Sequence, residues 1–308
     1  MTNKIVAIQG NHPSLLNPKT DTSIFLANEI QKKKYRIFFY DPKDLSIINS
    51  KVSAKGFFVK FNYNSYKFYK ILKKQTLDLV KCKYILIRQD PPFNLEYIST
   101  TFILETIKNR VKIINDPSSI RNISEKLYSI KYQKFMPSTI FTQNFSEIKN
   151  FFKKNKYVIL KAIHSFGGND IHLLNRFNLN FIKKFIKKHG HIMCQKYLSK
   201  ISKGDKRVFL INGKIRGAIS RVPRKGSYLS NMSKGAIAKK TQLTKIEKKI
   251  SKVIARDLKN AKVYFAGINF IDQRLNGDIN VTSPTGLKTL FDISKINLAK
   301  TFWKDLKS

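Results

Sequence analysis

The start of the chain alternates apolar strand-like segments with an amphipathic one, and this rhythm constrains the fold more than any other feature. Residues 5–8 and 37–40 are apolar runs of strand length, and residues 23–33 between them repeat their apolar positions with helical spacing. Asp21 to Ser23 supply side chains of the kind that cap a helix N-terminus. A strand, a helix and a second strand in this order predict a parallel βαβ unit.

The same rhythm continues to about residue 120. Residues 84–87 and 111–114 are apolar and strand-like, and residues 96–108 between them are helix-like. We therefore predict that residues 1–120 form an N-terminal domain around an open, mainly parallel α/β sheet.

Beyond Pro117 strands and helices mix in a way typical of α+β domains, and we divide this part into residues 121–200 and 201–308. The predicted elements are a short helix at 124–130, strands at 157–161 and 171–174 joined by a turn with Gly167 and Gly168, a helix at 179–188, a strand at 192–198, a hairpin of 208–211 and 214–219 around Asn212-Gly213, a helix at 245–258, strands at 264–270 and 278–282, and a terminal helix after 292.

The composition is that of a globular protein, and the 42% hydrophobic content of its 308 residues can fill a core. No apolar run approaches the roughly 20 residues that span a bilayer, and the first residues carry no cleavage pattern. Cys82 and Cys194 lie far apart and lack metal-type spacing. We expect a cytoplasmic protein in a reducing compartment, with no membrane partner.

The formal net charge of +41 has two readings. A basic surface attracts nucleic acid or anionic membranes. However, only eleven of the 60 basic residues are arginines, and the lysines are dispersed as short pairs such as Lys153-Lys154 rather than gathered in a tail. Abundant lysine, asparagine and isoleucine are also what an adenine- and thymine-rich genome encodes. We favour this compositional reading and do not expect a nucleic-acid partner.

Common catalytic fingerprints are absent from the sequence. It has neither a Gly-x-Gly-x-x-Gly after the first strand nor a glycine-rich loop ending in Gly-Lys-Ser/Thr. It has no Gly-x-Ser-x-Gly, and its five histidines lack zinc-ligand spacing. These absences disfavour Rossmann oxidoreductases, P-loop ATPases, serine hydrolases and zinc enzymes.

Two short motifs come first among the candidate site residues. Residues 87–93, Ile-Arg-Gln-Asp-Pro-Pro-Phe, follow a strand, and their two prolines restrict the loop that carries Arg88. By themselves they could form a turn with a surface Arg-Asp pair. Residues 122–127, Asn-Ile-Ser-Glu-Lys-Leu, place Lys126 on the predicted helix, where it could reach a phosphate or lie in solvent.

Residues 159–168 combine a strand lysine with glycines. Lys161 follows apolar residues within a strand, so it requires an anionic partner if it is buried, and a phosphate would supply one. The backbone amides of Gly167 and Gly168 could close over that phosphate. Residues 195–198 end the next apolar strand and could offer backbone groups to an adenine edge, or serve only as a connector.

The most specific motif lies near the C-terminus. Asp278 and Asn280 are two residues apart on a predicted strand, so both oxygens face the same side and could hold a hard cation. Asn269 lies on the preceding strand. Turn chemistry at a strand end is the alternative.

Taken together and in this order, these segments resemble the prokaryotic glutathione synthetases of the ATP-grasp superfamily, from about Asp21 to the C-terminal helix. The pairing of Arg-Gln-Asp-Pro-Pro-Phe at 88–93 with Asn-Val-Thr-Ser-Pro-Thr-Gly at 280–286 carries most of this resemblance. It implies an ATP-grasp fold preceded by the N-terminal domain. It also implies an ATP-dependent ligase that joins γ-glutamylcysteine to glycine through an acyl phosphate and releases ADP and phosphate.

The resemblance further implies residue roles. ATP would be bound by Lys126, Lys161, Gly167, Gly168, Gln195, Tyr197, Leu198 and Asp205. Arg207 and Arg221 would stabilise the transferring phosphoryl group, and Asp278, Asn280 and Asn269 would hold Mg²⁺, with Mn²⁺ as a substitute. The other substrates would be bound by Arg88, Asn231, Gly235, Ser283, Pro284, Thr285 and Gly286. Residues 224–240 would form a mobile cover, and we expect a homo-oligomer.

Three departures from the family pattern bear on activity. Asn269 stands where the family usually has an aspartate, and Asp278 replaces the usual glutamate after an apparent one-residue insertion at Asn276-Gly277. The cover has Leu229-Ser230 in place of the usual Arg-Gly. Two alternatives therefore stay open. One is a related carboxylate–amine ligase, and the other is a decayed, non-catalytic member whose basic surface binds nucleic acid.

Overall fold

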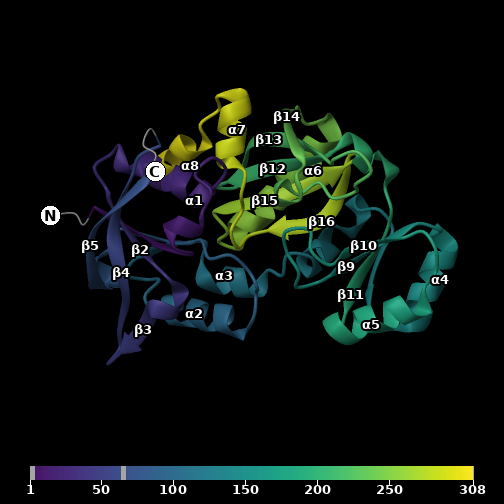
Figure 1. Cartoon of the computed structure of the whole chain (residues 1–308), viewed down its shortest axis with the longest axis horizontal. Coiled ribbons are helices and arrows are strands. Elements are labelled where there is room, and N and C mark those ends of the chain that lie inside the picture. Colours follow the sequence, from purple (N-terminus) through teal and green to yellow (C-terminus); the bar gives the residue numbers. More distant parts are fainter. Residues whose placement is uncertain (1–3, 64–66, 308) are drawn as a thin grey trace.

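A computed structural model describes residues 4–63 and 67–307, and these residues form three β-sheets, each built from one continuous stretch of chain. Along the long axis of the elongated molecule, the third sheet along the chain lies between the first and the second (Figure 1). The first lies within residues 1–120, the second within 121–200 and the third within 201–308.

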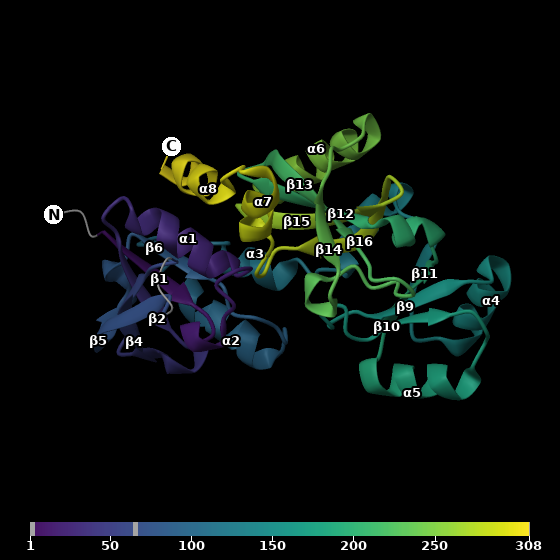
Figure 2. The ribbon, with the colours of Figure 1, turned by 45° about the horizontal axis from the view of Figure 1, so that its top comes forward.

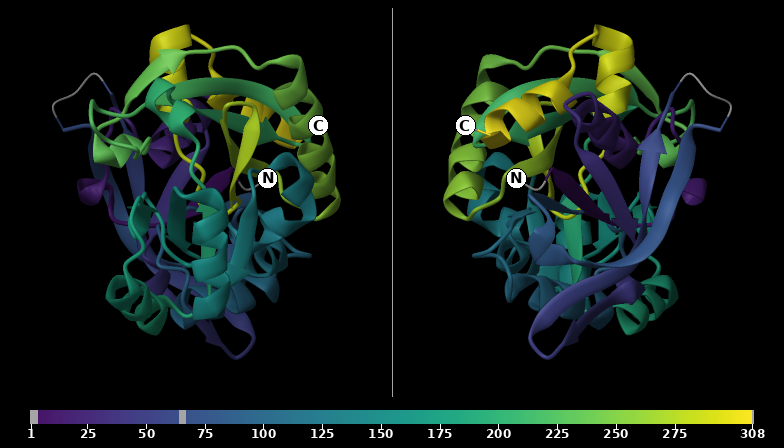
Figure 3. Two further views of the ribbon diagram at one scale, coloured as in Figure 1. Left: turned by 90° about the vertical axis from the view of Figure 1, so that its right-hand side faces the viewer. Right: turned by 90° about the vertical axis from the view of Figure 1, so that its left-hand side faces the viewer.

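The first sheet has seven strands and is mixed. Four strands run parallel in the order β2-β1-β6-β7, and three antiparallel strands extend the sheet beyond β2. The long ribbon of β4 and β5 runs along the outer side of the molecule in the right-hand view of Figure 3. The strands are β1 (Ile5–Gln9), β2 (Arg36–Tyr40), β3 (Leu45–Ile48), β4 (Lys51–Phe61), β5 (Tyr69–Asp78), β6 (Tyr84–Ile87) and β7 (Lys112–Ile114).

The parallel part of this sheet was predicted, and its antiparallel extension was not. Most β5 side chains are exposed or half-buried, and the strand carries three lysines. Strand periodicity is therefore weak there, because it depends on one face being buried and the other solvated.

Helices cover both faces of the first sheet. One face packs against α1 (Thr22–Gln31), which Asp21 caps by accepting from the Ile24 N–H at 2.7 Å, and the other packs against α2 (Leu95–Glu105) and α3 (Pro117–Asn122). The cap confirms the predicted start of the helix.

The C-terminal helices return to this first sheet. They are α7 (Leu287–Ser294) and α8 (Leu298–Lys307), and α8 lies beside α1 in Figures 1 and 2. The buried Trp303 donates from Nε1 to the Leu26 carbonyl at 2.8 Å. The two ends of the chain therefore share one apolar core, although they lie in different predicted domains.

The second sheet is antiparallel, in the order β10-β9-β11-β8. Two amphipathic helices bury their apolar faces against it, and α5 lies along one side of the sheet in Figure 2. The elements are β8 (Thr139–Thr142), α4 (Phe145–Asn155), β9 (Val158–Ala162), β10 (Ile171–Leu174), α5 (Leu179–His189) and β11 (Ile192–Lys196).

The third sheet is also antiparallel, in the order β14-β13-β12-β15-β16, and α6 packs against it. The predicted hairpin is confirmed, because Asn212 and Gly213 join two paired strands with φ of 49° and 70°. The elements are β12 (Asp205–Ile211), β13 (Lys214–Val222), β14 (Ile237–Lys240), α6 (Lys245–Asn260), β15 (Phe265–Ile271) and β16 (Arg274–Asn280).

Several predicted boundaries were wrong. The helix predicted at 96–108 ends at Glu105. The helix predicted at 124–130 is a turn through Lys126 followed by a 3-10 helix, Leu127–Phe135. The strand predicted at 192–198 ends at Lys196, and the strand predicted at 278–282 instead covers Arg274–Asn280. The last strand begins earlier because a tight turn at Asp272 and Gln273, both with positive φ, returns the chain directly from β15.

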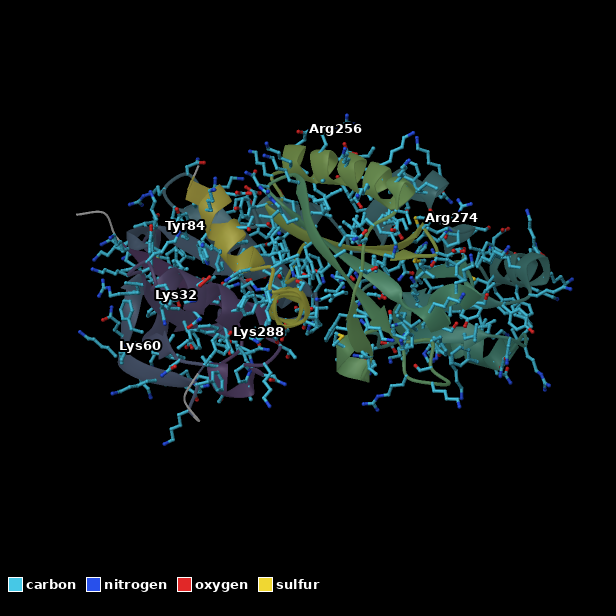
Figure 4. All side chains as sticks on the ribbon, turned by 90° about the horizontal axis from the view of Figure 1, so that it is seen from above. Lys32, Lys60, Tyr84, Arg256, Arg274 and Lys288 are labelled. Atoms are coloured by element: carbon cyan, nitrogen blue, oxygen red, sulfur yellow. The ribbon has the colours of Figure 1, made fainter. Side chains whose placement is uncertain are left out.

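Basic side chains are spread over the surface rather than gathered. In Figure 4 the labelled Lys32 and Lys60 lie at the N-terminal end of the molecule, Lys288 near its middle, and Arg256 and Arg274 farther along. This agrees with the compositional reading of the net charge. Within residues 4–63 and 67–307, no helix combines the length and apolar character needed to cross a bilayer.

Asn115 joins the first sheet to the third. Its buried side chain donates from Nδ2 to the carbonyls of Phe265 and Val281, at 2.8 and 2.6 Å. Its Oδ1 accepts from the N–H groups of Tyr264 and Phe265, at 2.9 and 2.8 Å. One amide group therefore satisfies four buried backbone groups near β15.

Replacing Asn115 by alanine should lower the free energy of unfolding by about 3 kcal/mol, since it leaves several buried backbone groups without partners. Chemical denaturation of the variant and the parent measures this difference. The matched control is Asn109→Ala at a nearby exposed position, which should change stability by no more than about 0.5 kcal/mol. Equal stabilities of the two variants would contradict the role given to Asn115.

Candidate active site

A cavity that leaves about 80 Å³ for the centres of water molecules, and that opens to solvent, lies between the second and third sheets. Its walls come from the strands β9 to β13, β15 and β16 and from the loops between them. It brings together most of the predicted site residues, which are Lys126, Lys161, Gly167, Gly168, Gln195, Tyr197, Leu198, Asp205, Arg207, Arg221, Asn231, Asn269 and Asp278.

Other predicted residues lie outside the lining of this cavity. Asn280 is on the same strand as Asp278, and Gly235 lies within the predicted cover, directly after the 3-10 helix Met232–Lys234. Arg88 and the turn Ser283 to Gly286 lie at the junction of the first sheet with the C-terminal helices.

Lys161 bridges the two sheets that form the cavity. It is buried on β9, and its Nζ donates to the backbone carbonyl and to Oδ1 of Asn276 on β16, at 2.8 and 2.7 Å. The nearest carboxylate is Asp278, with Oδ2 at 3.8 Å from Nζ. A buried ammonium held chiefly by neutral oxygens is a strong binding group for an added anion.

Lys126 enters the cavity from the turn before the 3-10 helix. Its Nζ donates to the carbonyl of Ser165 at 2.8 Å and to that of Ile163 at 3.4 Å, directly before the glycine turn. This buried ammonium also has carbonyl oxygens rather than a carboxylate as its hydrogen-bond partners. The two predicted phosphate-binding lysines therefore lie in one cavity, although they come from distant segments.

Two arginines on neighbouring strands differ in their partners. Arg221 forms a two-pronged ion pair with Asp205 directly opposite it, including Nε to Oδ1 at 2.8 Å. Nε and Nη1 of Arg207 are buried and have no hydrogen-bond partner among the described residues. Gly267 makes room for this guanidinium, because a Cβ there would lie 2.3 Å from Nη1. Arg207 is therefore the arginine left to bind an added anion.

The predicted metal ligands are hard oxygen donors that face the same region. Burial alone would raise the pKa of Asp278, but nearby cations, Lys161 foremost, hold it below its usual value, so the group is a carboxylate at neutral pH. The Oδ1 atoms of Asn269 and Asn280 are buried and accept no hydrogen bond in the described part of the chain. Unpaired oxygens beside a carboxylate suit Mg²⁺.

The charge of this donor set is low. Residues 4–63 and 67–307 contain no group of three or more histidine, cysteine, aspartate or glutamate side chains that could hold a metal. Of the three predicted ligands, Asp278 is the one carboxylate, and Asn269 and Asn280 are neutral amides.

The remaining charges of the cavity favour an anionic occupant. Burial lowers the pKa of Arg207 to about 10, assisted by the neighbouring Arg221, so Arg207 stays charged at neutral pH. Burial alone would lower the pKa of Arg221, but the ion pair with Asp205 outweighs it and raises this pKa. Glu125 also lines the cavity, and burial raises its pKa against the opposing effect of Lys126.

The strand end after β11 has one free backbone donor. The N–H of Lys196 donates to the Ser138 carbonyl at 2.8 Å, and that of Tyr197 donates to the Tyr157 carbonyl at 3.0 Å. The N–H of Leu198 has no such partner within the described residues. Gln195 is buried and donates to Thr139 Oγ1 at 3.0 Å. Among residues 196–198 of this predicted adenine segment, Leu198 is the one whose N–H has no backbone partner in the described part of the chain.

The predicted cover lies against the glycine turn. Tyr228 donates from its hydroxyl to the Ile171 carbonyl at 3.2 Å, and Lys234 Nζ donates to Asn169 Oδ1 at 2.7 Å. Gly168 has φ of 82°, and a Cβ there would lie 2.6 Å from Oδ1 of Asn231. The turn and the cover therefore fit together only because residue 168 lacks a side chain.

A second polar cluster surrounds Arg88. Its Nε donates to Ser23 Oγ at 3.0 Å, and the neighbouring Thr22 Oγ1 accepts from the Gly286 N–H at 3.1 Å. The start of α1 thus joins Arg88 to the predicted turn at 283–286. Arg88 Nη1 and the Tyr97 hydroxyl are buried without hydrogen-bond partners in the ranges described. These donors suit a carboxylate.

Sequence reasoning missed three residues at the main cavity. Glu125 precedes the predicted Lys126 and was given no role, and Tyr228 was treated only as part of the cover. Asn276 was noted as an insertion, yet it lies on the same face of β16 as Asp278 and Asn280. The two-residue spacing that selected the latter pair could have found Asn276 as well.

Comparisons with known proteins cover nearly the whole chain. The family models for the N-terminal domain and the ATP-grasp domain of prokaryotic glutathione synthetase match residues 5–121 and 125–295. A glutathione synthetase of Mesorhizobium japonicum is 34% identical over 303 residues, which covers 97% of this chain and 96% of that protein. One from Escherichia coli is 33% identical over 281 residues, covering 89% of each.

A solved structure gives the same fold. The ATP-grasp ligase PsnB, complexed with a phosphomimetic variant of its minimal precursor, Mg and ADP, aligns with a TM-score of 0.66 at 11% identity. The alignment covers 100% of this chain and 98% of PsnB.

Gly168→Ala should weaken ADP binding about tenfold, because the new Cβ displaces Asn231 and a residue with positive φ stores roughly 1–3 kcal/mol of strain. Isothermal titration calorimetry measures the affinity. Gly190→Ala is the matched control, since its φ is 66° but nothing lies within 4 Å of the added Cβ. Equal ADP affinity in both variants would show that contact between the turn and the cover does not affect binding.

Proposed function

The chain belongs to the prokaryotic glutathione synthetase family and is an ATP-dependent carboxylate–amine ligase that makes glutathione, and from this premise we propose which of its side chains carry the reaction. Its fold is ATP-grasp. The proposal concerns the residues, the metal and the assembly.

We assign the main cavity to ATP. Lys126, Lys161 and the amides of Gly167 and Gly168 bind its phosphates, and residues 195–198 border the adenine. The assignment is supported by two buried ammonium groups whose hydrogen bonds go to neutral oxygens. Asp205 acts through Arg221, because it accepts two hydrogen bonds from that guanidinium.

We assign Asp278, Asn269 and Asn280 to Mg²⁺, with Mn²⁺ as a substitute. Support comes from the ionised carboxylate and from two buried amide oxygens that accept no hydrogen bond from the described residues. When bound, the cation neutralises charge on the phosphates of ATP. Asn269 contributes an oxygen but no charge, so metal affinity depends more strongly on Asp278.

The reaction proceeds in two balanced steps. A carboxylate oxygen of γ-glutamylcysteine attacks the γ-phosphorus, the bond to the bridging oxygen breaks, and ADP leaves with the electron pair. The glycine amine then attacks the acyl carbon, phosphate leaves, and the amine loses a proton to solvent. Arg207 and Arg221 stabilise the transferring phosphoryl group. The cover excludes water, which would hydrolyse the acyl phosphate.

We assign Arg88, Asn231, Gly235 and the turn Ser283, Pro284, Thr285 and Gly286 to the dipeptide and glycine. The unpaired Nη1 of Arg88 supports a role in holding a substrate carboxylate. The first turn of α1 joins Arg88 to this turn, because Ser23 Oγ accepts from Arg88 Nε and Thr22 Oγ1 accepts from the Gly286 N–H.

The assembly and location are also proposals. We retain three domains at 1–120, 121–200 and 201–308, with the C-terminal helices docked on the first. The proposed assembly is a homo-oligomer. Two buried free thiols fit the reducing cytoplasm.

The observation that carries the proposal is that Lys126, Lys161, Arg207 and Asp278 line one cavity. Purified protein given ATP, Mg²⁺, γ-glutamylcysteine and glycine should release phosphate and form the tripeptide. Lys161→Met should lower kcat at least about 10²-fold, as loss of a transition-state donor does. Lys183→Met, at an exposed position on α5, is the control and should leave the rate unchanged. Full activity of Lys161→Met would overturn the assignment.

Restoring a carboxylate at residue 269 tests the metal assignment. Asn269→Asp should lower the Mg²⁺ concentration for half-maximal activity about fivefold, because it adds a charged oxygen ligand. The control is Asn260→Asp at the exposed end of α6, which should leave this concentration unchanged. The same Mg²⁺ dependence in both variants would remove Asn269 from the ligand set.

A further inference from the structure

Asn276 lies between the two charged groups on which ATP and metal binding depend in the function proposed above. It belongs to Asn276-Gly277, where the resemblance to the family implies a one-residue insertion. On β16 it shares a face with Asp278 and Asn280, and it lines the main cavity.

Both polar ends of this side chain are occupied. Its Oδ1 and its backbone carbonyl accept from Lys161 Nζ, at 2.7 and 2.8 Å. Its Nδ2 donates to Asp278 Oδ2 at 3.2 Å. The direct separation between Lys161 Nζ and Asp278 Oδ2 is 3.8 Å, which is longer than a charge-assisted hydrogen bond.

This arrangement prevents a closer ion pair. Lys161 and Asp278 come from different sheets, and both side chains are largely buried, which reduces the solvent screening of their attraction. Because Asn276 accepts two of the three ammonium hydrogens, the lysine is held away from the carboxylate and keeps one hydrogen for a phosphate. The amide of Asn276 in turn orients the carboxylate.

The distance between the Lys161 ammonium and the Asp278 carboxylate matters more in this site than it would in a metal site with two carboxylate ligands. Asn269 contributes no charge, so Asp278 is the single anionic side chain among the proposed Mg²⁺ ligands. A lysine bound tightly to that carboxylate would compete with the cation for it.

We propose that Asn276 is a positioning residue that keeps the Lys161 ammonium from neutralising Asp278, and so leaves one group for phosphate and the other for the metal. The inference rests on the proposed function, since it assumes that ATP and Mg²⁺ bind in this cavity. It gives the inserted residue a role in metal affinity.

The test is the binding of Mn²⁺ to the protein saturated with ADP, followed by electron paramagnetic resonance. Asn276→Ala should raise the Mn²⁺ Kd about tenfold, because Lys161 closes onto Asp278. Asn276→Asp should bind Mn²⁺ no more weakly than the parent, because its carboxylate still holds Lys161. The control is Asn260→Ala on α6, which should match the parent.

Several results would overturn this role. It is excluded if Asn276→Ala binds Mn²⁺ within twofold of the parent, or if Asn276→Asp is weakened as much as Asn276→Ala. A matching loss of ADP affinity measured without metal would also exclude it, because the effect would then lie in nucleotide binding. Thermal unfolding checks that each variant is folded, and Asn276→Ser replaces the alanine variant if that one does not fold.

ADP and Mn²⁺ binding measured on the parent protein distinguishes a failure of this inference from a failure of the proposed function. If the parent binds neither ADP nor Mn²⁺ in the presence of ADP, the proposed function fails with it. If the parent binds both and Asn276→Ala behaves identically, only the role of Asn276 fails.

Discussion

The candidate active site depends on buried cationic side chains around the main cavity, whose positive charge the protein's own carboxylates do not fully neutralise. Of the cations around the main cavity, Arg221 is paired with Asp205, whereas Lys126 and Lys161 donate to neutral oxygens and Arg207 has unpaired donors among the described residues. Buried cations without tight counterions are costly unless a ligand supplies the missing charge. A polyphosphate meets this requirement, and a metal bound at Asp278 adjusts the balance. The same constraint explains why neutral carbonyls and an amide, rather than carboxylates, hold the two lysines.

The rest of the fold keeps these groups in one place. Lys161 comes from the second sheet and Asp278 from the third, so the site exists only while the two sheets face each other. Asn115 fixes the third sheet to the first, and α8 returns to α1, where Trp303 closes a core shared by both ends of the chain. This packing also sets Gly286 beside the start of α1, which carries the partner of Arg88. The contacts that stabilise the fold and the residues that we assign to the dipeptide and glycine therefore share the same interface.

The gathering of the candidate residues in one cavity was largely predictable from sequence, because the residues that we assign to phosphate and metal lie in motifs with clear strand or turn context. Lys161 in an apolar strand, the glycine turn after it, and the two-residue spacing of Asp278 and Asn280 gave the cavity its main residues. The resemblance to glutathione synthetases was confirmed by the family models and relatives. The antiparallel extension was missed because β5 buries little, and the bridge made by Asn276 was missed because it depends on contact between two sheets. Long-range pairing of polar groups leaves no local signal in the sequence.

The most direct test of the account is a crystal structure of the protein with an unreactive ATP analogue and Mn²⁺, located by anomalous scattering. The account predicts a metal peak at bonding distance from the Asp278 carboxylate, with the analogue's phosphates in contact with Lys126 and Lys161. A nucleotide bound elsewhere, or a metal that does not touch Asp278, would contradict it.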